Sequence, residues 1–224
     1  MILNFKKHIV NQSVKDNIVQ FFLYRLAFVF VHIFKFFKIT PNQISFISFI
    51  LCIISCYFLY HNQPTLFLIL WYISHFLDYC DGTLARLTGK TTQSLLRVDH
   101  FVDLIRIVIT FLFISLFYNS NIIWVLTIVF LSSFFLSQIL SFEYDAKKQA
   151  NPNFKNIISI NKKNVFFKHF YNIFFTFNGH TLFILGFILI NDFFATFIYS
   201  YLILLNLKNL YSPLNFLIKT KRKN

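Results

Sequence analysis

The chain has 224 residues, of which 57% are hydrophobic and 13% are charged, and its formal net charge is +13. A soluble domain of this length carries charge on about a quarter of its residues, so the composition excludes an ordinary soluble protein and predicts an all-α integral membrane protein. The positive charge does not indicate nucleic acid binding, because Lys and Arg gather in alternate connections between apolar stretches. That alternation is typical of the cytoplasmic segments of membrane proteins.

The first predicted element covers residues 18–38 and differs from the later apolar stretches. On a helix, Arg25, His32 and Lys35 fall within about 80° of one another, while Phe and Leu fill the other faces. This pattern predicts an N-terminal amphipathic helix that lies in the membrane interface, with an additional, poorly hydrophobic span as the alternative. Pro41 disfavours helix at the residue before it and can start the next helix itself.

Six transmembrane helices are expected to follow, within a single domain over residues 1–224. Their expected bounds are about 43–60, 64–86, 95–118, 122–142, 168–190 and 193–207. A polar cytoplasmic loop is expected after the fourth span, to about Asn164. Six spans place both termini on the cytoplasmic side, in agreement with the basic segments at each end of the chain. The basic residues at 219–223 are expected to contact anionic lipid headgroups or to act only as a topology signal.

Four of the eight acidic residues lie in one segment, "DYCDGTLARLTGKTTQSLLRVDHFVD", residues 78–103. They are Asp78, Asp81, Asp99 and Asp103. Spacings of three and four place each pair on one helix face. The second and third predicted spans are antiparallel neighbours because a short connection joins them, so the carboxylates can converge at their cytoplasmic ends. Such a cluster can bind hard divalent cations or hold protons, and exposed charges without a joint role are the third interpretation.

Small residues beside the acids favour a ligand over a proton path. Gly82 and Ala85 leave a slot along the helix face where a flat group can approach the backbone, and Arg86 adds a cation at the helix end. Carboxylates for metal ions, a slot for a base and a cation suit a nucleotide diphosphate.

The segment resembles the signature of the CDP-alcohol phosphotransferase (CDP-alcohol phosphatidyltransferase) family. That signature is Asp, two residues, Asp-Gly, two residues, Ala-Arg, eight residues, Gly, three residues, Asp, three residues, Asp. The matched positions are Asp78, Asp81, Gly82, Ala85, Arg86, Asp99 and Asp103. The sequence Thr40-Pro41-Asn42, just before the first predicted span, is also similar to the family. Leu95 stands where the family has its second glycine, which lies near the bound nucleotide and metal, so a degenerate, non-catalytic member is one alternative.

The resemblance implies metal-dependent transfer of a substituted phosphoryl group, phosphatidyl in the leading interpretation, with release of CMP in phospholipid biosynthesis. The donor would be a CDP-alcohol such as CDP-diacylglycerol, and the acceptor the hydroxyl of a small polar alcohol. An aminoalcohol phosphotransferase, with a soluble CDP-alcohol and a lipid acceptor, shares the signature. A transporter is less compatible, because the acids gather at one end of the membrane rather than near its midplane. The resemblance also implies that the protein forms a homodimer and that it contacts membrane lipids.

The resemblance further assigns roles to individual residues. Asp78, Asp81, Asp99 and Asp103 would hold Mg²⁺ or Mn²⁺, as two ions, and Asp103 would also be the general base. Gly82, Ala85 and Arg86 would contact the CDP moiety. From their positions in the sequence, Arg106, Arg97 and His180 are further candidates for acceptor binding, and a structural ion pair is the alternative for Arg106.

Overall fold

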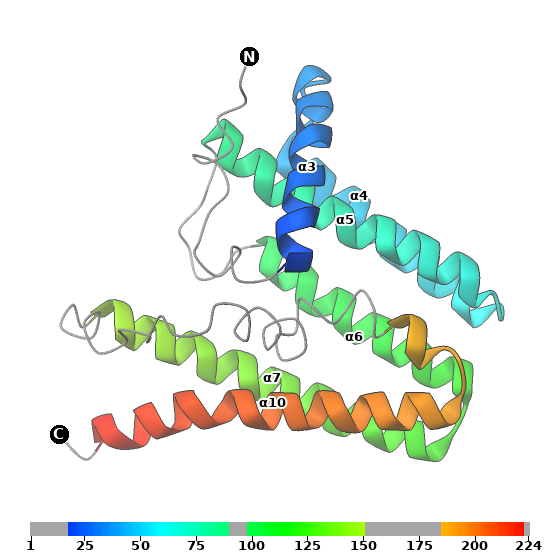
Figure 1. Ribbon diagram of the computed structural model, residues 1–224, viewed down its shortest axis with the longest axis vertical. Coiled ribbons are helices and arrows are strands. Elements are labelled where there is room, and N and C mark those ends of the chain that lie inside the picture. Colours follow the sequence, from blue (N-terminus) through cyan, green and yellow to red (C-terminus); the bar gives the residue numbers. More distant parts are fainter. Residues whose placement is uncertain (1–17, 90–97, 151–184, 222–224) are drawn as a thin grey trace. The chain divides into compact units, whose positions relative to one another are not determined.

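The computed structural model describes residues 18–89, 98–150 and 185–221, and all regular elements in these ranges are helices (Figure 1). The helices are α3 (Ile18–Phe36), α4 (Pro41–Tyr60), α5 (Pro64–Thr88), α6 (Val98–Tyr118), α7 (Asn121–Ala150) and α10 (Asp192–Lys221). The described residues form two compact units, the first from residues 18–89, 98–117 and 185–186 and the second from residues 118–150 and 187–221. The predicted all-α class is therefore confirmed.

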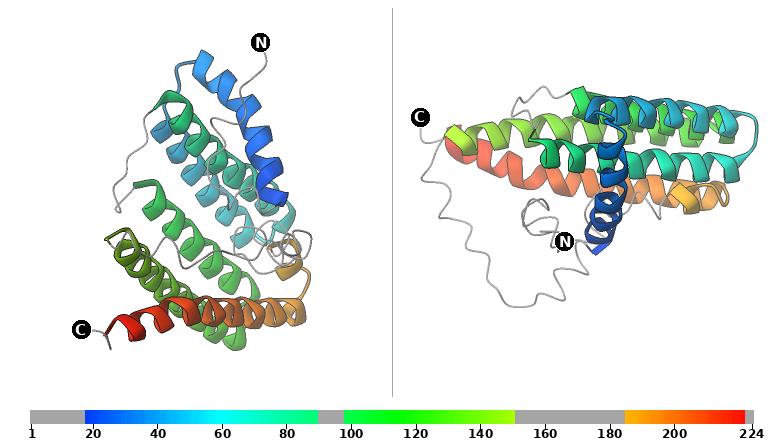
Figure 2. Two further views of the ribbon diagram at one scale, coloured as in Figure 1. Left: turned by 60° about the vertical axis from the view of Figure 1, so that its left-hand side comes forward. Right: turned by 90° about the horizontal axis from the view of Figure 1, so that it is seen from above.

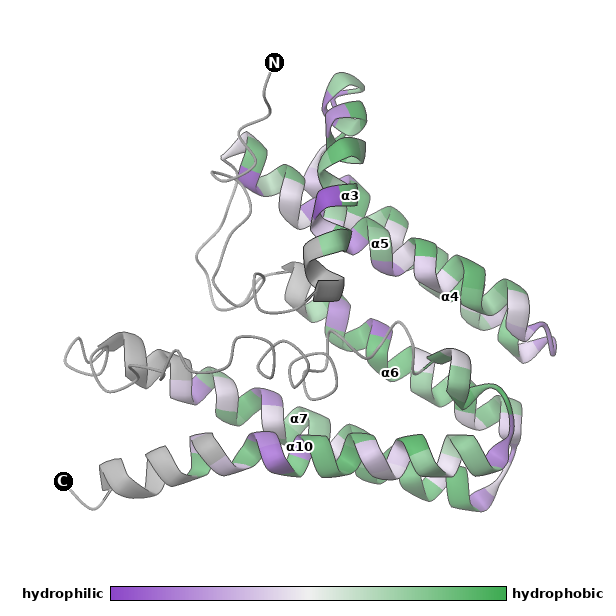
Figure 3. Cartoon of the chain, in the orientation of Figure 1, coloured by the Kyte–Doolittle hydropathy of each residue, from purple (hydrophilic) through white to green (hydrophobic). Residues whose placement is uncertain are grey.

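Four helical segments of the described residues have the length and apolar composition needed to cross a membrane. They are Pro41–Tyr60, Phe101–Tyr118, Asn121–Tyr144 and Asp192–Tyr211. Figure 3 shows hydrophobic residues over most of these segments, and hydrophilic residues in the turn between α4 and α5. The chain is thus a multi-pass membrane protein.

The second and fifth predicted spans, 64–86 and 168–190, are not among these four segments. The 25 residues of α5 also suffice to cross a bilayer, but the acids and the arginine in its second half lower its hydropathy. Most of the predicted fifth span, 168–190, lies outside the described residues.

The start of α4 follows the predicted break at Pro41, which occupies the first turn of the helix. Thr40 is the N-cap, and its backbone N–H donates to Gln43 Oε1 at 2.8 Å while the Gln43 N–H donates to Thr40 Oγ1 at 3.4 Å. This reciprocal capping box satisfies two backbone donors at the helix start. Because it fixes where α4 begins, it also fixes which residues of α4 face α5.

Helices α4 and α5 pair closely along their length (Figure 2). Ser48 donates through Oγ to the Ser74 carbonyl at 2.9 Å, and Ser74 Oγ donates to the Ser48 carbonyl at 2.7 Å. Small hydroxyl side chains let two backbones approach and satisfy each other inside an apolar environment. The pair ends at Gly89, whose left-handed conformation (φ 69°) closes α5.

Helix α3 crosses α5 and packs on its second half (Figures 1 and 2). Ala27 and Val31 of α3 are buried against Tyr79, Cys80 and Leu84 of α5. The remaining surface of α3 exposes its basic residues together with large apolar side chains. These are Phe22, Arg25, Leu26, Val29, Phe30, His32, Ile33, Lys35 and Phe36. The predicted helix is thus present, and its place in the membrane interface stays a prediction.

In the second unit, α7 and α10 lie side by side (Figure 1). Phe130 and Tyr199 pack edge to face with ring centroids 6.2 Å apart, and Asn206 Nδ2 donates to Ser133 Oγ at 3.1 Å. The hydrogen bond from the buried Asn206 to the half-buried Ser133 helps to hold the pair together.

Two helices in this unit are longer than the membrane spans predicted for them. Helix α7 continues to Ala150 instead of ending near 142, so residues 143–150 are not part of a loop. Helix α10 continues to Lys221 instead of ending near 207, and it includes Pro213. Hydropathy marks where the apolar segment ends, whereas residues such as Glu, Ala, Lys and Gln continue a helix readily into water.

Candidate active site

The acidic segment lies on the second half of α5 and the first half of α6. Asp81 is buried, with 7% of its surface exposed, and its Oδ2 accepts a hydrogen bond from Ser45 Oγ. Ser45 lies on the second turn of α4, and its position follows from the capping box at Thr40. The polar entry of α4 therefore orients one carboxylate of the segment.

Arg106 joins the carboxylates of the two helices. Its Nη1 lies 3.1 Å from Asp78 Oδ1 on α5 and 3.3 Å from Asp103 Oδ1 on α6. Its Nη2 donates to Ser74 Oγ at 3.2 Å, and Ser74 is itself bonded to α4. One guanidinium thus brings Asp78 and Asp103 together across the α5–α6 interface. Of the two interpretations of Arg106, the structure contains the ion pair.

The exposure of these groups differs in a way that matters for binding. The Arg106 side chain is 6% exposed, whereas those of Asp78 and Asp103 are 27% and 39% exposed. The cation is enclosed and the carboxylate oxygens remain accessible. Two carboxylates share one guanidinium here, so the contacts of Arg106 leave an excess of negative charge that a divalent cation would balance.

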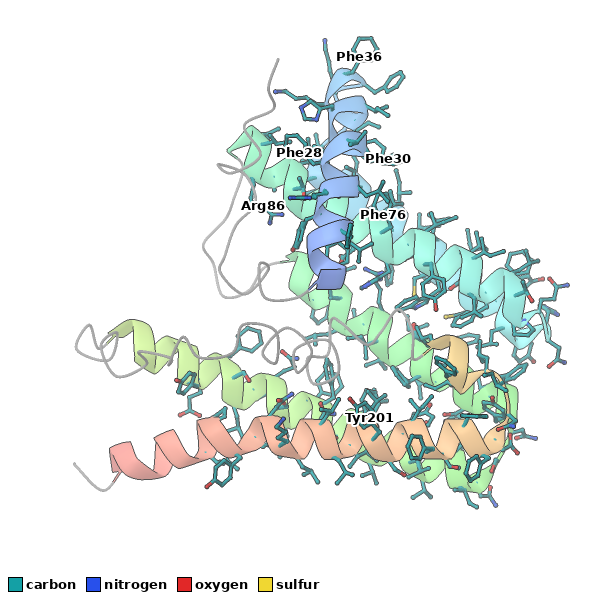
Figure 4. All side chains as sticks on the ribbon, in the orientation of Figure 1. Phe28, Phe30, Phe36, Phe76, Arg86 and Tyr201 are labelled. Atoms are coloured by element: carbon teal, nitrogen blue, oxygen red, sulfur yellow. The ribbon has the colours of Figure 1, made fainter. Side chains whose placement is uncertain are left out.

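The predicted slot at Gly82 is lined by Arg86. A Cβ atom at Gly82 would lie 3.4 Å from Arg86 Nη1. Arg86 Nη2 donates to Thr83 Oγ1 at 3.2 Å, and its guanidinium lies 5.2 Å from the ring centroid of Tyr24 on α3. Figure 4 shows Arg86 beside α3, where that helix crosses α5. Arg86 therefore lies beside Gly82, while Arg106 contacts the carboxylates.

Tyr24 belongs to the surroundings of the same slot. Its ring packs edge to face on Tyr79 with centroids 5.0 Å apart. Burial raises the pKa of the Tyr24 phenol, and the neighbouring Arg86 guanidinium opposes that rise. Tyr24 therefore stays neutral at physiological pH and presents an aromatic face to Arg86.

Several predicted residues cannot be placed in the site. Asp99 lies within α6, but its side chain is outside the described part, as are Leu95, Arg97 and His180. Among the described side chains, no three of the His, Cys, Asp and Glu groups stand close enough to hold a metal ion. The predicted metal set includes Asp99, so it stays a prediction. The oxygen donors that are described, on Asp78, Asp81 and Asp103, fit the preference of Mg²⁺ and Mn²⁺ for hard ligands.

Sequence reasoning missed four residues around the acids: Tyr24, Ser45, Ser74 and His75. His75 lies one turn before Asp78, a spacing that helical periodicity alone could have singled out. The partners of Ser45, Ser74 and Tyr24 depend on how α4, α6 and α3 pack on α5. No pattern within the sequence carries that information.

Comparison with known proteins agrees with the signature. The profile of the CDP-alcohol phosphatidyltransferase family matches residues 38–204. An archaetidylinositol phosphate synthase from Pyrococcus horikoshii is 40% identical over 55 residues, a match that covers 25% of this chain and 29% of the archaeal protein. The matched part thus spans less than a third of that relative. The family profile covers most of the chain, including the capped start of α4, the paired acids of α5 and α6 and the arginine between them, and on this evidence the chain belongs to the CDP-alcohol phosphatidyltransferase family, whose members are transferases of substituted phosphate groups.

Proposed function

We propose that the protein transfers a phosphatidyl-type group from a CDP-alcohol such as CDP-diacylglycerol to the hydroxyl of a small polar alcohol and releases CMP. The observation that carries this proposal is the arrangement of Asp78 and Asp103 on neighbouring helices around Arg106. It brings accessible carboxylates from both halves of the signature to one place, as transfer between two bound substrates requires.

The acids are proposed to hold the metal ions. Asp78, Asp81, Asp99 and Asp103 would bind Mg²⁺ or Mn²⁺, as two ions, and the accessible oxygens of Asp78 and Asp103 support this. Bound metal would neutralise the pyrophosphate of the donor and stabilise the leaving CMP. Asp81 is oriented for such a role by Ser45, because a second hydrogen bond fixes the direction of a metal-binding carboxylate.

Asp103 is proposed as the general base that takes the proton of the acceptor hydroxyl. It has the most exposed side chain of the Arg106 cluster, at 39%, so an incoming hydroxyl can reach it. Arg106 holds Asp103 beside Asp78, and Asp78 lies about one helical turn before Gly82 on α5. The attacking hydroxyl and the phosphorus atom would therefore meet between Asp78 and Asp103.

The nucleotide is proposed to bind along Gly82, Ala85 and Arg86. Gly82 lets a flat ring approach the backbone of α5, and Arg86 lies at the edge of that notch with Tyr24 behind it. The guanidinium of Arg86 would swing from Thr83 to a phosphate or a base oxygen when the donor binds.

The topology is proposed to be six spans with an interfacial α3, and with the active site and both termini on the cytoplasmic side. The exposed Phe22, Phe30 and Phe36 of α3, together with Arg25 and Lys35, support an interfacial position. A homodimer remains part of the proposal, on the ground of family membership.

The test is CMP release by the purified protein in lipid nanodiscs with Mg²⁺ or Mn²⁺. One arm supplies CDP-diacylglycerol with glycerol 3-phosphate, inositol, inositol phosphate or serine. Inositol phosphate is included because the archaeal relative is named for a product that contains it. The other arm supplies CDP-choline or CDP-ethanolamine with diacylglycerol.

We expect release in the first arm only, dependent on one acceptor and abolished by Asp103→Asn. Release in the second arm only would assign the aminoalcohol branch. Folded protein that releases no CMP in either arm would contradict the proposed activity and favour the non-catalytic alternative raised by Leu95.

A further inference from the structure

One face of α5 extends the candidate site beyond the signature. On an ideal helix, His75, Gly82 and Arg86 fall within about 40° of one another, and Asp78 lies about 60° from His75. His75 and Gly82 therefore stand on opposite sides of Asp78 along the same face, about 10 Å apart in helical rise. The nucleotide slot occupies the Gly82 side of this face, and His75 occupies the other side.

His75 carries a buried nitrogen that has no hydrogen-bond partner in the described part of the chain. In the described part of the chain, three buried side-chain atoms have no hydrogen-bond partner: His75 Nε2, Arg86 Nε and Arg106 Nε. All three belong to residues on or against this face of α5. Buried polar groups are almost always paired, since an unpaired one weakens the fold, so the unpaired Nε2 of His75, one turn before Asp78, calls for a ligand.

The ring of His75 is held in a fixed orientation. It stacks on Trp71 with centroids 5.1 Å apart and an interplanar angle of 20°, and it meets Tyr79 edge-on at 5.3 Å and 86°. Trp71 is itself anchored, because its Nε1 donates to Thr110 Oγ1 on α6 at 3.0 Å. A ring clamped in this way presents its nitrogen in one direction, which is what a binding group needs.

We propose that His75 is an acceptor-binding residue whose Nε2 forms a hydrogen bond with a hydroxyl of the polar acceptor alcohol. The inference rests on the proposed function, because it places the acceptor on the side of Asp78 opposite the nucleotide. A hydroxyl can either donate to or accept from an imidazole nitrogen, so it satisfies Nε2 in either tautomer. An acceptor held here would bring its reacting hydroxyl between Asp78 and Asp103.

The variant that tests this is His75→Phe, which keeps a ring against Trp71 and Tyr79 and removes both nitrogens. His75→Gln is the rescue variant, since its amide can restore a hydrogen bond at the same reach. His61→Phe is the matched control. His61 also packs against aromatic rings, with its ring centroid 4.4 Å from that of Tyr57, but it lies in the exposed turn after α4. Steady-state kinetics of CMP release give the KM values of donor and acceptor separately.

We expect His75→Phe to raise the acceptor KM at least tenfold and to change the donor KM less than twofold. His75→Gln should recover part of the acceptor affinity, and His61→Phe should match the natural protein. An unchanged acceptor KM in His75→Phe, or equal rises in both KM values, would overturn the proposal and leave His75 as an aromatic packing residue.

Binding measurements keep this test separate from the test of activity. Thermophoresis with myo-inositol, inositol 1-phosphate and glycerol 3-phosphate compares the natural protein with His75→Phe without any turnover. Binding by the natural protein that His75→Phe weakens tenfold supports His75 even if no CMP is released. Equal binding by both proteins, or binding of none of the three probes, contradicts the assignment of His75.

Discussion

Arg106 is the residue on which the geometry of the acidic cluster depends. It is enclosed between α5 and α6, it contacts a carboxylate on each, and it reaches α4 through Ser74. A buried cation with two carboxylate partners is costly to leave incomplete, because removing either sign leaves the other uncompensated. The cluster is therefore held together by charge as well as by helix packing.

Replacing Arg106 should destabilise the protein through its partners. We expect Arg106→Met to lower the free energy of unfolding by about 1–3 kcal/mol, less than for a fully enclosed pair because both carboxylates still reach solvent. Adding Asp103→Asn should restore part of this loss, since it removes one of two facing negative charges. Thermal unfolding in detergent measures both, with Arg25→Met on the exposed side of α3 as the control. If the changes in the free energy of unfolding caused by the two substitutions simply add, the ion pair is contradicted.

Gly82 offers a case in which stability and activity should move apart. A Cβ atom there meets only the end of the flexible Arg86 side chain, at 3.4 Å, so Gly82→Ala should fold normally. Alanine favours helix over glycine by about 0.5–1 kcal/mol, so the melting temperature should stay or rise. The donor KM should nevertheless increase several-fold, because the methyl group fills the proposed nucleotide slot.

The control for that change is Gly186→Ala, where the nearest atom is the Tyr72 hydroxyl at 3.7 Å. It should leave the donor KM as it is. If Gly82→Ala also leaves the donor KM unchanged, the slot at Gly82 does not bind the nucleotide.

At the residue scale, the chain itself reveals the acids and their spacing, and it allows an ion pair for Arg106. It does not reveal Ser45 as the partner of Asp81, because that contact depends on the register of α4 against α5. The spacing of His75, one turn before Asp78, can be read from the sequence. Its unpaired nitrogen cannot, because that depends on how the neighbouring helices pack around it.

At the scale of the elements, helix starts were more predictable than helix ends. Pro41 and Pro64 each occupy the first turn of a helix, and Gly89 closes one, because these residues restrict or extend backbone conformation locally. Helices α7 and α10 continue beyond the spans predicted for them, because the apolar pattern ends with the membrane while the helix does not. No local signal marks the last helical residue in water.

In the proposed topology, helix α3 would link the membrane surface to the proposed nucleotide slot, since it carries both exposed phenylalanines and Tyr24. Figure 4 shows Phe30 of α3 close to Phe76 of α5, and their rings pack edge to face at 5.3 Å. The contact is close because Ala27, at the centre of the crossing, is fully buried. A larger residue at Ala27 would push α3 away from α5.

Ala27→Leu tests this link. We expect it to cost about 1–3 kcal/mol through overpacking and to raise the donor KM, because Tyr24 would move away from Arg86. Val29→Leu, on the exposed side of the same helix at 59% exposure, also enlarges an aliphatic side chain and should do neither. Thermal unfolding and donor kinetics on both variants decide the matter. A destabilised Ala27→Leu protein with an unchanged donor KM would detach α3 from substrate binding.

At the scale of the whole molecule, the proposed topology makes a claim that labelling can check. The turn between α4 and α5 contains Asn62, and α5 ends with the exposed Thr88. One helix separates them, so they should lie on opposite sides of the membrane. The natural cysteines, Cys52, Cys56 and Cys80, are buried and should contribute little background.

With Asn62→Cys, a membrane-impermeant maleimide should label intact cells. With Thr88→Cys, labelling should require permeabilised cells. The reverse pattern would place the acidic cluster on the outer side, and labelling of both positions in intact cells would mean that α5 does not cross the membrane.

The central claim is that the carboxylates of α5 and α6 form one metal-dependent site for CMP release. The most direct measurement records Mn²⁺ binding by electron paramagnetic resonance and CMP release in the same nanodisc samples, for the natural protein and Asp103→Asn. We expect two Mn²⁺ ions per chain, CMP release that rises with their occupancy, and a loss of at least about 100-fold in kcat in Asp103→Asn. Release of CMP that continues without Mn²⁺ or Mg²⁺, or that survives Asp103→Asn, would contradict the account.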